Sequence, residues 1–302
     1  MRRNFATRGG IADLQLTMSL RVWRQFGSDA RNFLWISFWV GISLGIGTIL
    51  LNLYLVALGY STSFLGLLMV NTAAGAGVAA LPIGRLADRF GKKMLLFAGG
   101  ALAGVGQMIL LFHPTPHLLL LSAWISGIGG ATLIIVAAPL LHDYAPQGMR
   151  TKLYSWHFAT GTLAAVLGNF IGGWLPSILA YGVGIEADSA EAYRWSLFIG
   201  LLVAGMAALP LYRLREPCIP IRKERTDGRD PGRQIWNIPW MLAVPQFLTG
   251  MGAGLFLPYL NLFFTQHLGA ETSQAGLILG VEAVTAGLAG LGAPLIGRSL
   301  GR

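Results

Sequence analysis

A twelve-residue stretch, PIGRLADRFGKK, places five charged side chains between two long apolar segments. Its one carboxylate, Asp88, can accept hydrogen bonds from backbone N–H groups at a helix N-terminus and favours the positive end of the helix dipole. Gly84 and Gly91 allow a tight turn where the backbone reverses between closely packed helices. The cations of the stretch are Arg85, Arg89, Lys92 and Lys93. The pattern therefore predicts a charged turn between two helices.

Glu282 is the one acidic residue well inside an apolar segment. It lies near 12 Å from the end of its predicted helix at about 1.5 Å per residue. A charged side chain at such a depth costs at least about 2.5–3.5 kcal/mol. One interpretation is proton or cation coupling, or a counter-charge for a cationic substrate. The other is a structural carboxyl bonded to a neighbouring helix, and both stay open.

Amide and aromatic side chains in the apolar segments are the remaining candidates for a substrate cavity. Asn52, Asn71 and Asn261 are candidate substrate contacts, with hydrogen bonds between helices as the alternative for each. Tyr259 could belong to an aromatic cavity wall, but packing or lipid contact is the favoured interpretation. No metal or cofactor site is expected, because Pro114 and Pro116 break any helix that would align the histidines beside them. No phosphate loop or nucleophile elbow occurs either, so an enzyme is not expected.

The composition indicates a membrane protein that positions these residues on transmembrane helices. Hydrophobic residues make up 54% of the 302 residues and charged residues 12%, and the mean hydropathy is +0.60. Soluble domains have about 25% charged residues. A helix needs about 20 apolar residues to cross the hydrocarbon. The predicted spans are 33–58, 63–82, 94–112, 118–141, 152–176, 195–212, 238–266 and 274–297.

Positive charges sort to one side of these spans. Every Lys and Arg except Arg194 falls in the N-terminal tail, in the second, fourth or sixth connection, or at the C-terminal end. The positive-inside rule then predicts a multi-pass protein of the plasma membrane with a cytoplasmic N-terminus. His142 and Asp143 are interpreted as loop charges beside the fourth span. A nucleic-acid binder is the weakest option, because its charges would not sort by membrane side, and no nucleic-acid partner is expected.

An internal repeat appears when the sequence is shifted by 210 residues. Gly66 then meets Gly276, Gly77 meets Gly287, and Gly91-Lys92 meets Gly301-Arg302. The repeat unit is therefore six helices. The predicted organisation is a tail (1–32), a six-helix bundle (33–212), a charged cytoplasmic linker (213–237) and two helices of a second bundle (238–302). An amphipathic helix or a partly ordered segment fits residues 11–26.

The segment GRLADRFGKK resembles the signature of the major facilitator superfamily (MFS), in its expected place between helices two and three. The resemblance implies that Asp88 and Arg89 latch the cytoplasmic side in the outward-facing state, with Gly84, Gly91 and Lys92 completing the motif. It also implies twelve helices in a complete member, so the chain is expected to be truncated after the eighth.

Helix five is similar to the family's antiporter motif, but Asn169 replaces its proline. That difference weakens the assignment of efflux. Ala164, Gly168 and Gly172 in the same helix are four residues apart and predict a smooth face for close packing. In helix seven, Pro245 and Pro258 predict a kink.

The sequence therefore predicts an all-α, polytopic membrane protein with the MFS fold. The expected function is secondary active transport of a small solute by alternating access, with proton coupling and a slight preference for efflux of amphipathic compounds. The alternative is a non-transporting membrane receptor or an inactive truncated remnant of such a transporter. The expected partners are a small-molecule substrate, protons and the lipid bilayer, and the expected state is a monomer without cofactors.

Overall fold

The computed structural model describes residue 23 and residues 25–146, 148–216, 237–256, 259–282 and 284–285. Every regular element among these residues is helical. The elements are α2 (Ser28–Ala57), α3 (Thr62–Phe90), α4 (Lys92–Phe112), α5 (Pro116–Tyr144), α6 (Arg150–Val183), α7 (Ala190–Gly205), α8 (Ala208–Arg213), α9 (Asn237–Phe256), α10 (Leu260–Leu262) and the π-helix η2 (Phe263–His267), followed by helical residues 272–282.

Six segments in the described ranges are long and apolar enough to cross a membrane. They are α2 to α6 and the combined segment Ala190–Arg213, and they match the first six predicted spans. The prediction of an all-α polytopic fold is confirmed. The seventh predicted span contains α9, α10 and η2, and the eighth begins with residues 272–282. Residues 11–22, Pro258 and the end of the eighth span lie outside the described residues.

Polar residues and glycines set the ends of the helices. The Ser61 hydroxyl accepts a hydrogen bond from the Phe64 backbone N–H (3.3 Å) and caps α3. Gly91 ends α3 and starts α4 with φ of +90°, a conformation that only glycine adopts without strain. The tight turn predicted at Gly91 is therefore confirmed. Gly84 lies inside α3 instead, so its predicted place in the turn is wrong.

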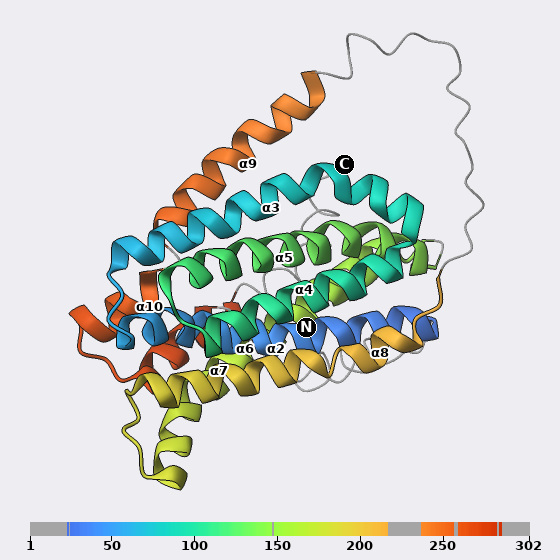
Figure 1. Ribbon diagram of the computed structural model, residues 1–302. Helices are drawn as coiled ribbons and strands as arrows, with labels where there is room; N and C mark the ends of the chain where they lie inside the picture. Colours follow the sequence, from blue (N-terminus) through green and yellow to red (C-terminus); the bar gives the residue numbers. More distant parts are fainter. Residues whose placement is uncertain are drawn as a thin grey trace, which may run out of the picture.

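The six spanning helices form two groups of three. In one group, α2 packs along α6 and α7; in the other, α5 packs along α3 and α4 (Figure 1). Glycines allow the close approach within each group. A Cβ atom at Gly129 of α5 would come within 2.6 Å of the Gly99 carbonyl oxygen of α4. On α6, Ala164 is fully buried, and Gly168 and Gly172 contact Ile42 and Ile46 of α2, which confirms the predicted smooth face.

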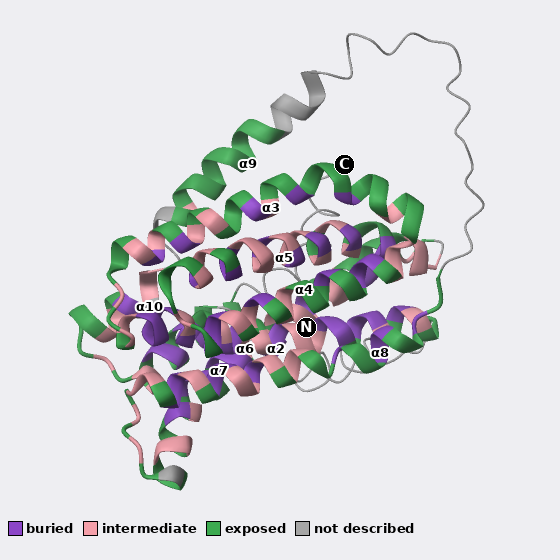
Figure 2. Ribbon diagram, in the orientation of Figure 1, coloured by how far each residue is buried: buried purple, intermediate pink, exposed green. Residues whose placement is uncertain are grey.

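The core lies in two clusters, one towards each end of the bundle. Figure 2 shows the buried residues along the helices. We call the end formed by residues 84–93, 143–146, 148–150 and 213–216 the basic end. The cluster there begins with Phe26, which precedes α2, and Trp23 packs against Trp156 with ring centroids 5.6 Å apart. The first helix therefore starts at Ser28, earlier than the predicted 33, because the apolar run marks only the part that crosses hydrocarbon.

Residues from the second half of the chain contact α2, α3 and α6. α10 packs on α2, and the Tyr259 hydroxyl lies 3.0 Å from the position of a Cβ at Gly66 in α3. At Gly276, a Cβ would approach the Asn169 carbonyl oxygen of α6 to 2.8 Å. By contrast, residues 243–252 of α9 are exposed, and α9 stands clear of α3 along much of its length (Figure 1).

Candidate functional site

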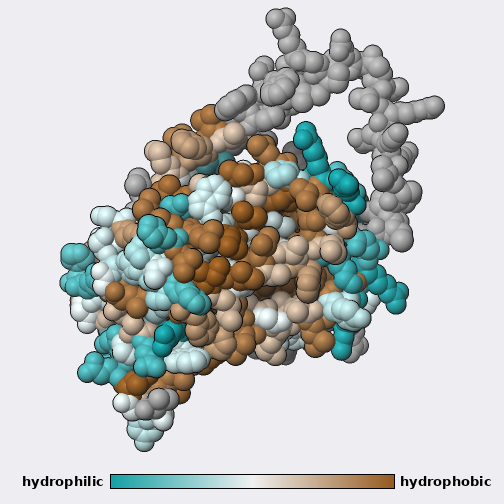
Figure 3. Space-filling view, viewed as in Figure 1, coloured by the Kyte–Doolittle hydropathy of each residue, from teal (hydrophilic) through white to brown (hydrophobic). Residues whose placement is uncertain are grey.

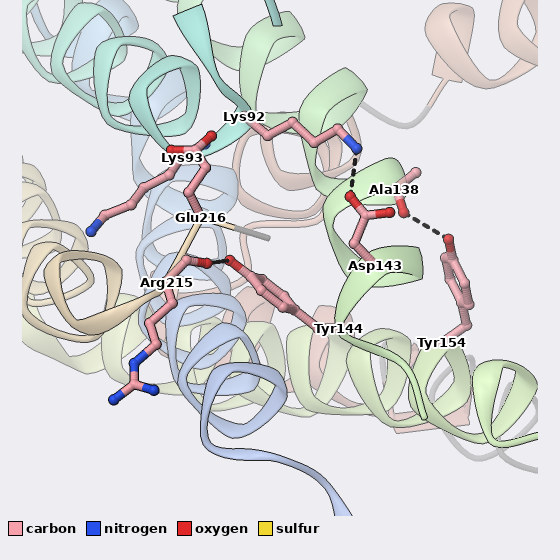
Figure 4. Close-up of polar contacts among 8 residues, drawn as sticks. All are labelled: Lys92, Lys93, Ala138, Asp143, Tyr144, Tyr154, Arg215 and Glu216. Carbon is pink, nitrogen blue, oxygen red and sulfur yellow. Dashed lines mark hydrogen bonds and ion pairs between the residues drawn. The ribbon is translucent and has the colours of Figure 1, made fainter. Parts of the chain in front are cut away.

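Lys92 and Lys93 of the predicted charged motif belong to an interlocked polar cluster at the basic end, shown in Figure 4. The Lys92 ammonium is 2.5 Å from Oδ2 of Asp143, at the last turn of α5. The Asp143 side chain is only 8% exposed and that of Lys92 26%. This ion pair ties the α3–α4 turn to the end of α5. The interpretation of Asp143 as a loop charge is wrong, because its helix continues to Tyr144 and buries it.

Glu216 supplies the carboxylate at the N-terminus of α4. Its Oε1 accepts a hydrogen bond from the Lys93 backbone N–H (3.3 Å). A Cβ atom at Gly91 would meet the same carboxylate, which would have to move, and the φ of +90° by itself favours glycine there. An anion at this position satisfies an unpaired N–H group and complements the helix dipole.

The segment after α8 is fixed by further bonds in the same cluster. The Tyr144 hydroxyl donates to the Arg215 carbonyl oxygen (2.7 Å), and the Arg215 N–H donates to Asp29 Oδ1 (3.1 Å). Leu214, the residue before Arg215, belongs to the core cluster at this end and is 2% exposed. The first residues of the predicted linker therefore pack at the basic end of the bundle, against the start of α2 and the end of α5. Figure 4 shows the bond to Tyr144 at the end of α5.

Asp88 and Arg89 lie at the margin of this cluster. Both are exposed, and within the described part of the chain Asp88 has no hydrogen bond or ion pair. The Arg89 guanidinium lies over the Phe90 ring, 5.3 Å from its centroid. The carboxylates that hold the turn are thus Asp143 and Glu216. The latch role of Asp88 and Arg89 stays a prediction.

The predicted cavity amides lie in different surroundings. Asn52 is 5% exposed in α2. Asn71 of α3 accepts a hydrogen bond from Trp124 Nε1 of α5 (2.9 Å) and donates to the Leu67 carbonyl oxygen (2.8 Å). Asn71 therefore joins α3 to α5, as the alternative interpretation expected, and its role in substrate binding stays a prediction. Asn261 belongs to α10, which packs on α2, but its side chain lies outside the described residues.

Tyr259 and Glu282 belong to the second half of the chain. Tyr259 is half-buried and packs against the core cluster at the end opposite to the basic end. Glu282 is exposed at the last described turn of helix 272–282. The structure does not bring these two side chains together with Asn71 into one described contact. Their roles in substrate binding stay predictions.

One polar contact and, among the described residues, one unpartnered polar atom inside the bundle were not predicted from the sequence. The Ser37 hydroxyl is 2.7 Å from Nδ1 of the half-buried His157, which joins α2 to α6. Asn169 is 5% exposed, and its Oδ1 has no hydrogen-bond partner among the residues that the structure describes. No group of three or more His, Cys, Asp or Glu side chains with metal-binding geometry occurs in those residues.

A family model described as Major Facilitator Superfamily matches residues 32–302. The chain belongs to this superfamily. Its members are transporters and not enzymes, so the assignment made from the charged motif and the repeat is confirmed. The match extends from α2 through the described helices of the second half.

Two curated relatives are named for drug resistance. The Quinolone resistance protein NorA of Staphylococcus aureus is 30% identical over 139 residues, 45% of this chain and 36% of that protein. Multidrug resistance protein 3 of Bacillus subtilis (strain 168) is 26% identical over 151 residues, 50% of this chain and 27% of that protein. The chain thus matches about a third of the length of these relatives.

Solved structures share the fold. A bacterial homologue of the human lysosomal transporter Spinster, inward-facing and occupied, has a TM-score of 0.65 and 21% identity. The match covers 88% of this chain and 59% of that one. The nucleoside transporter NupG has a TM-score of 0.64 and 15% identity over 88% of this chain and 67% of that one. At these identities the similarity concerns the fold alone.

Proposed function

We propose that this superfamily member is a secondary active transporter of a small solute that works by alternating access. It is placed in the plasma membrane with the basic end in the cytoplasm. Protons are the coupling ion, and efflux of amphipathic compounds is the direction. The family match supports transport, and the two resistance-protein relatives support efflux of drug-like compounds.

One structural observation carries the alternating-access part of the proposal. Contacts between the first six helices and residues 259–282 run from the end opposite to the basic end to about the middle of α6. They include Gly66 with Tyr259 and Gly173 with Ser273 at that end. At mid-height, a Cβ at Gly280 would lie 3.9 Å from a Val166 methyl group. Contacts between the two halves at this end fit a state that is closed on the side opposite to the basic end.

The interlocked cluster at the basic end fits the same mechanism. Lys92, Asp143 and Glu216 fix the α3–α4 turn to its own bundle, so the six helices can move as one body. Asp88 and Arg89 remain exposed on that rigid turn. They are thus available for contacts that form only when the basic ends of the two halves close.

Ethidium, an amphipathic cation, provides the test. Bacteria that lack their own drug exporters are loaded with ethidium, with and without expression of the chain. Expression should lower the steady-state fluorescence, and a protonophore should restore it. The Glu282→Gln variant should reach the same membrane level but lose most of this effect, because its side chain cannot exchange a proton. Thr285→Val, one turn away in the sequence, is the matched control and should keep the effect.

Unchanged ethidium levels with correctly inserted protein would contradict transport and favour the receptor or inactive-remnant alternative. Export that survives Glu282→Gln would leave transport standing and contradict only the coupling role of Glu282. Equal loss of membrane level and export in Glu282→Gln would instead assign that carboxyl a structural role.

A further inference from the structure

A cavity of about 650 Å³ opens between α4 and the α7–α8 segment. Its floor is the central helix α2, where Leu44 is 64% exposed. The described residues of the second half contact α2, α3 and α6, so this α4–α7 face points away from those contacts. Hydrophobic side chains cover the face between the two ends of the bundle, and hydrophilic ones gather at the ends (Figure 3). In a membrane, the groove therefore faces lipid.

Small residues hold this groove open rather than bringing helices together. Cβ atoms at Gly47, Gly100 and Gly205 would meet nothing within 4 Å, and one at Gly104 would meet only a Leu201 methyl group at 3.9 Å. On the other face of α4, by contrast, Gly99 contacts α5 so closely that a Cβ would lie 2.9 Å from Thr132 Cβ. The glycines on the groove side thus provide volume, not packing.

Two cationic residues, Lys93 and Arg213, form a rim at the mouth of the groove, at the basic end. Lys93 precedes Phe97, Gly100 and Gly104 on one face of α4, at helical spacing. Its ammonium donates one hydrogen bond to the Tyr212 carbonyl oxygen (2.9 Å) and lies 5.6 Å from the centre of the Tyr212 ring. The contact brings Lys93 next to the end of α8, where the exposed Arg213 follows.

The carboxylates around this rim are engaged elsewhere. Asp143 pairs with Lys92, Asp29 accepts from the Arg215 backbone, and Glu216 accepts from the Lys93 backbone N–H. Within the described ranges, neither Lys93 nor Arg213 forms an ion pair. Two cations without a carboxylate partner at the mouth of an apolar groove are complementary to a lipid that joins a negative headgroup to hydrocarbon.

We propose that the groove holds one acyl chain of an anionic phospholipid whose phosphate binds Lys93 and Arg213. The groove follows α4 from Leu96 to Gln107, about 16 Å at 1.5 Å per residue, which is close to half of a hydrocarbon core of about 30 Å. One leaflet's chain therefore fits its length. The proposed site binds a lipid of the leaflet at the basic end. The proposal does not depend on whether the chain transports a solute.

Native mass spectrometry of the full chain in detergent tests this site. The protein is mixed with equal amounts of dioleoyl phosphatidylglycerol and dioleoyl phosphatidylcholine. The wild type should retain phosphatidylglycerol preferentially. Lys93→Gln with Arg213→Gln should reduce the relative affinity for phosphatidylglycerol by about tenfold or more, the order expected for two cations near an anionic lipid. Arg150→Gln with Lys152→Gln removes the same charge from exposed positions on α6 at the same end and should leave the preference unchanged.

A second variant tests whether the acyl chain binds in the groove. Gly104→Leu fills the groove on a helix where leucine has the better propensity, so folding should be kept; circular dichroism and gel filtration verify it. Retention of both lipids should fall. Absence of a phosphatidylglycerol preference in the wild type, an equal loss in both charge variants, or unchanged retention in folded Gly104→Leu would each overturn the proposal.

Discussion

At the scale of single residues, the ion pair between Lys92 and Asp143 is the contact that holds the charged turn. Asp143 is nearly buried, so loss of its charge leaves an ammonium without a partner at a site only partly open to water. Leaving a buried polar or charged group unpaired costs more than the net gain from forming the pair. Asp88 is exposed and has no partner in the described part of the chain, so loss of its charge leaves no other group unpaired there.

We predict that Asp143→Asn destabilises the protein by about 1–3 kcal/mol. The double variant Lys92→Gln with Asp143→Asn should recover part of that loss, because the two side chains are coupled. Asp88→Asn should change stability by no more than about 0.5 kcal/mol while reducing transport. Apparent melting temperatures in detergent provide the comparison. A loss of stability in Asp88→Asn as large as in Asp143→Asn would show that the wrong carboxylate has been assigned to the turn.

At the scale of elements, α4 starts without a capping side chain of its own. Gly91 precedes it, and the place of a cap is taken by the carboxylate of Glu216, 123 positions after Lys93, whose backbone N–H it accepts from. The start of α4 is therefore coupled to the segment after α8, although no motif in the sequence joins the two.

We predict that Glu216→Gln lowers stability by about 0.3–1 kcal/mol, because it removes an anion from the helix N-terminus. The effect should be local. Amide hydrogen exchange of residues 92–95 should become faster, while exchange in the middle of α6 stays unchanged. Identical exchange of residues 92–95 in both proteins would contradict the capping role.

The α2–α6 contact depends on glycines that face the partner backbone. At Gly168, a Cβ would lie 2.9 Å from the Ile42 Cα, whereas one at Gly161 of the same helix would meet nothing within 4 Å. Gly168→Leu should therefore cost about 3 kcal/mol or more, at the upper end of overpacking effects, and Gly161→Leu should be tolerated. The yield of monodisperse protein after detergent extraction measures both. Similar yields would mean that the two helices do not pack as described.

At the scale of the whole molecule, the sequence was sufficient to predict the six spanning helices and the family. Long apolar runs and the sorting of charges are local signals. They mark the part of a helix that lies in the hydrocarbon core of the membrane, and not where the helix begins or ends. For this reason α3 continues to Phe90, beyond the predicted 82, and α2 starts before 33. The turn at Gly91 could be predicted because its glycine and charges are adjacent in sequence.

The partners in the charged cluster could not be predicted in this way. Asp143 lies 51 positions after Lys92, and its sequence neighbours resemble those of any charge at a helix end. Only the packing of α4 along α5 brings the two side chains together. The same holds for the groove between α4 and α7, since each lining glycine reads equally well as a packing residue until the helices are placed.

The membrane orientation is the claim on which the whole account depends. Cells are treated with a membrane-impermeant maleimide. The native Cys218, in the linker after the basic end, is one probe; Ser63→Cys in a Cys218→Ser background is the other, at the exposed start of α3. The account predicts that Ser63→Cys reacts in intact cells and that Cys218 reacts only after permeabilisation. Reaction of both positions in intact cells, or of Cys218 alone, would contradict it.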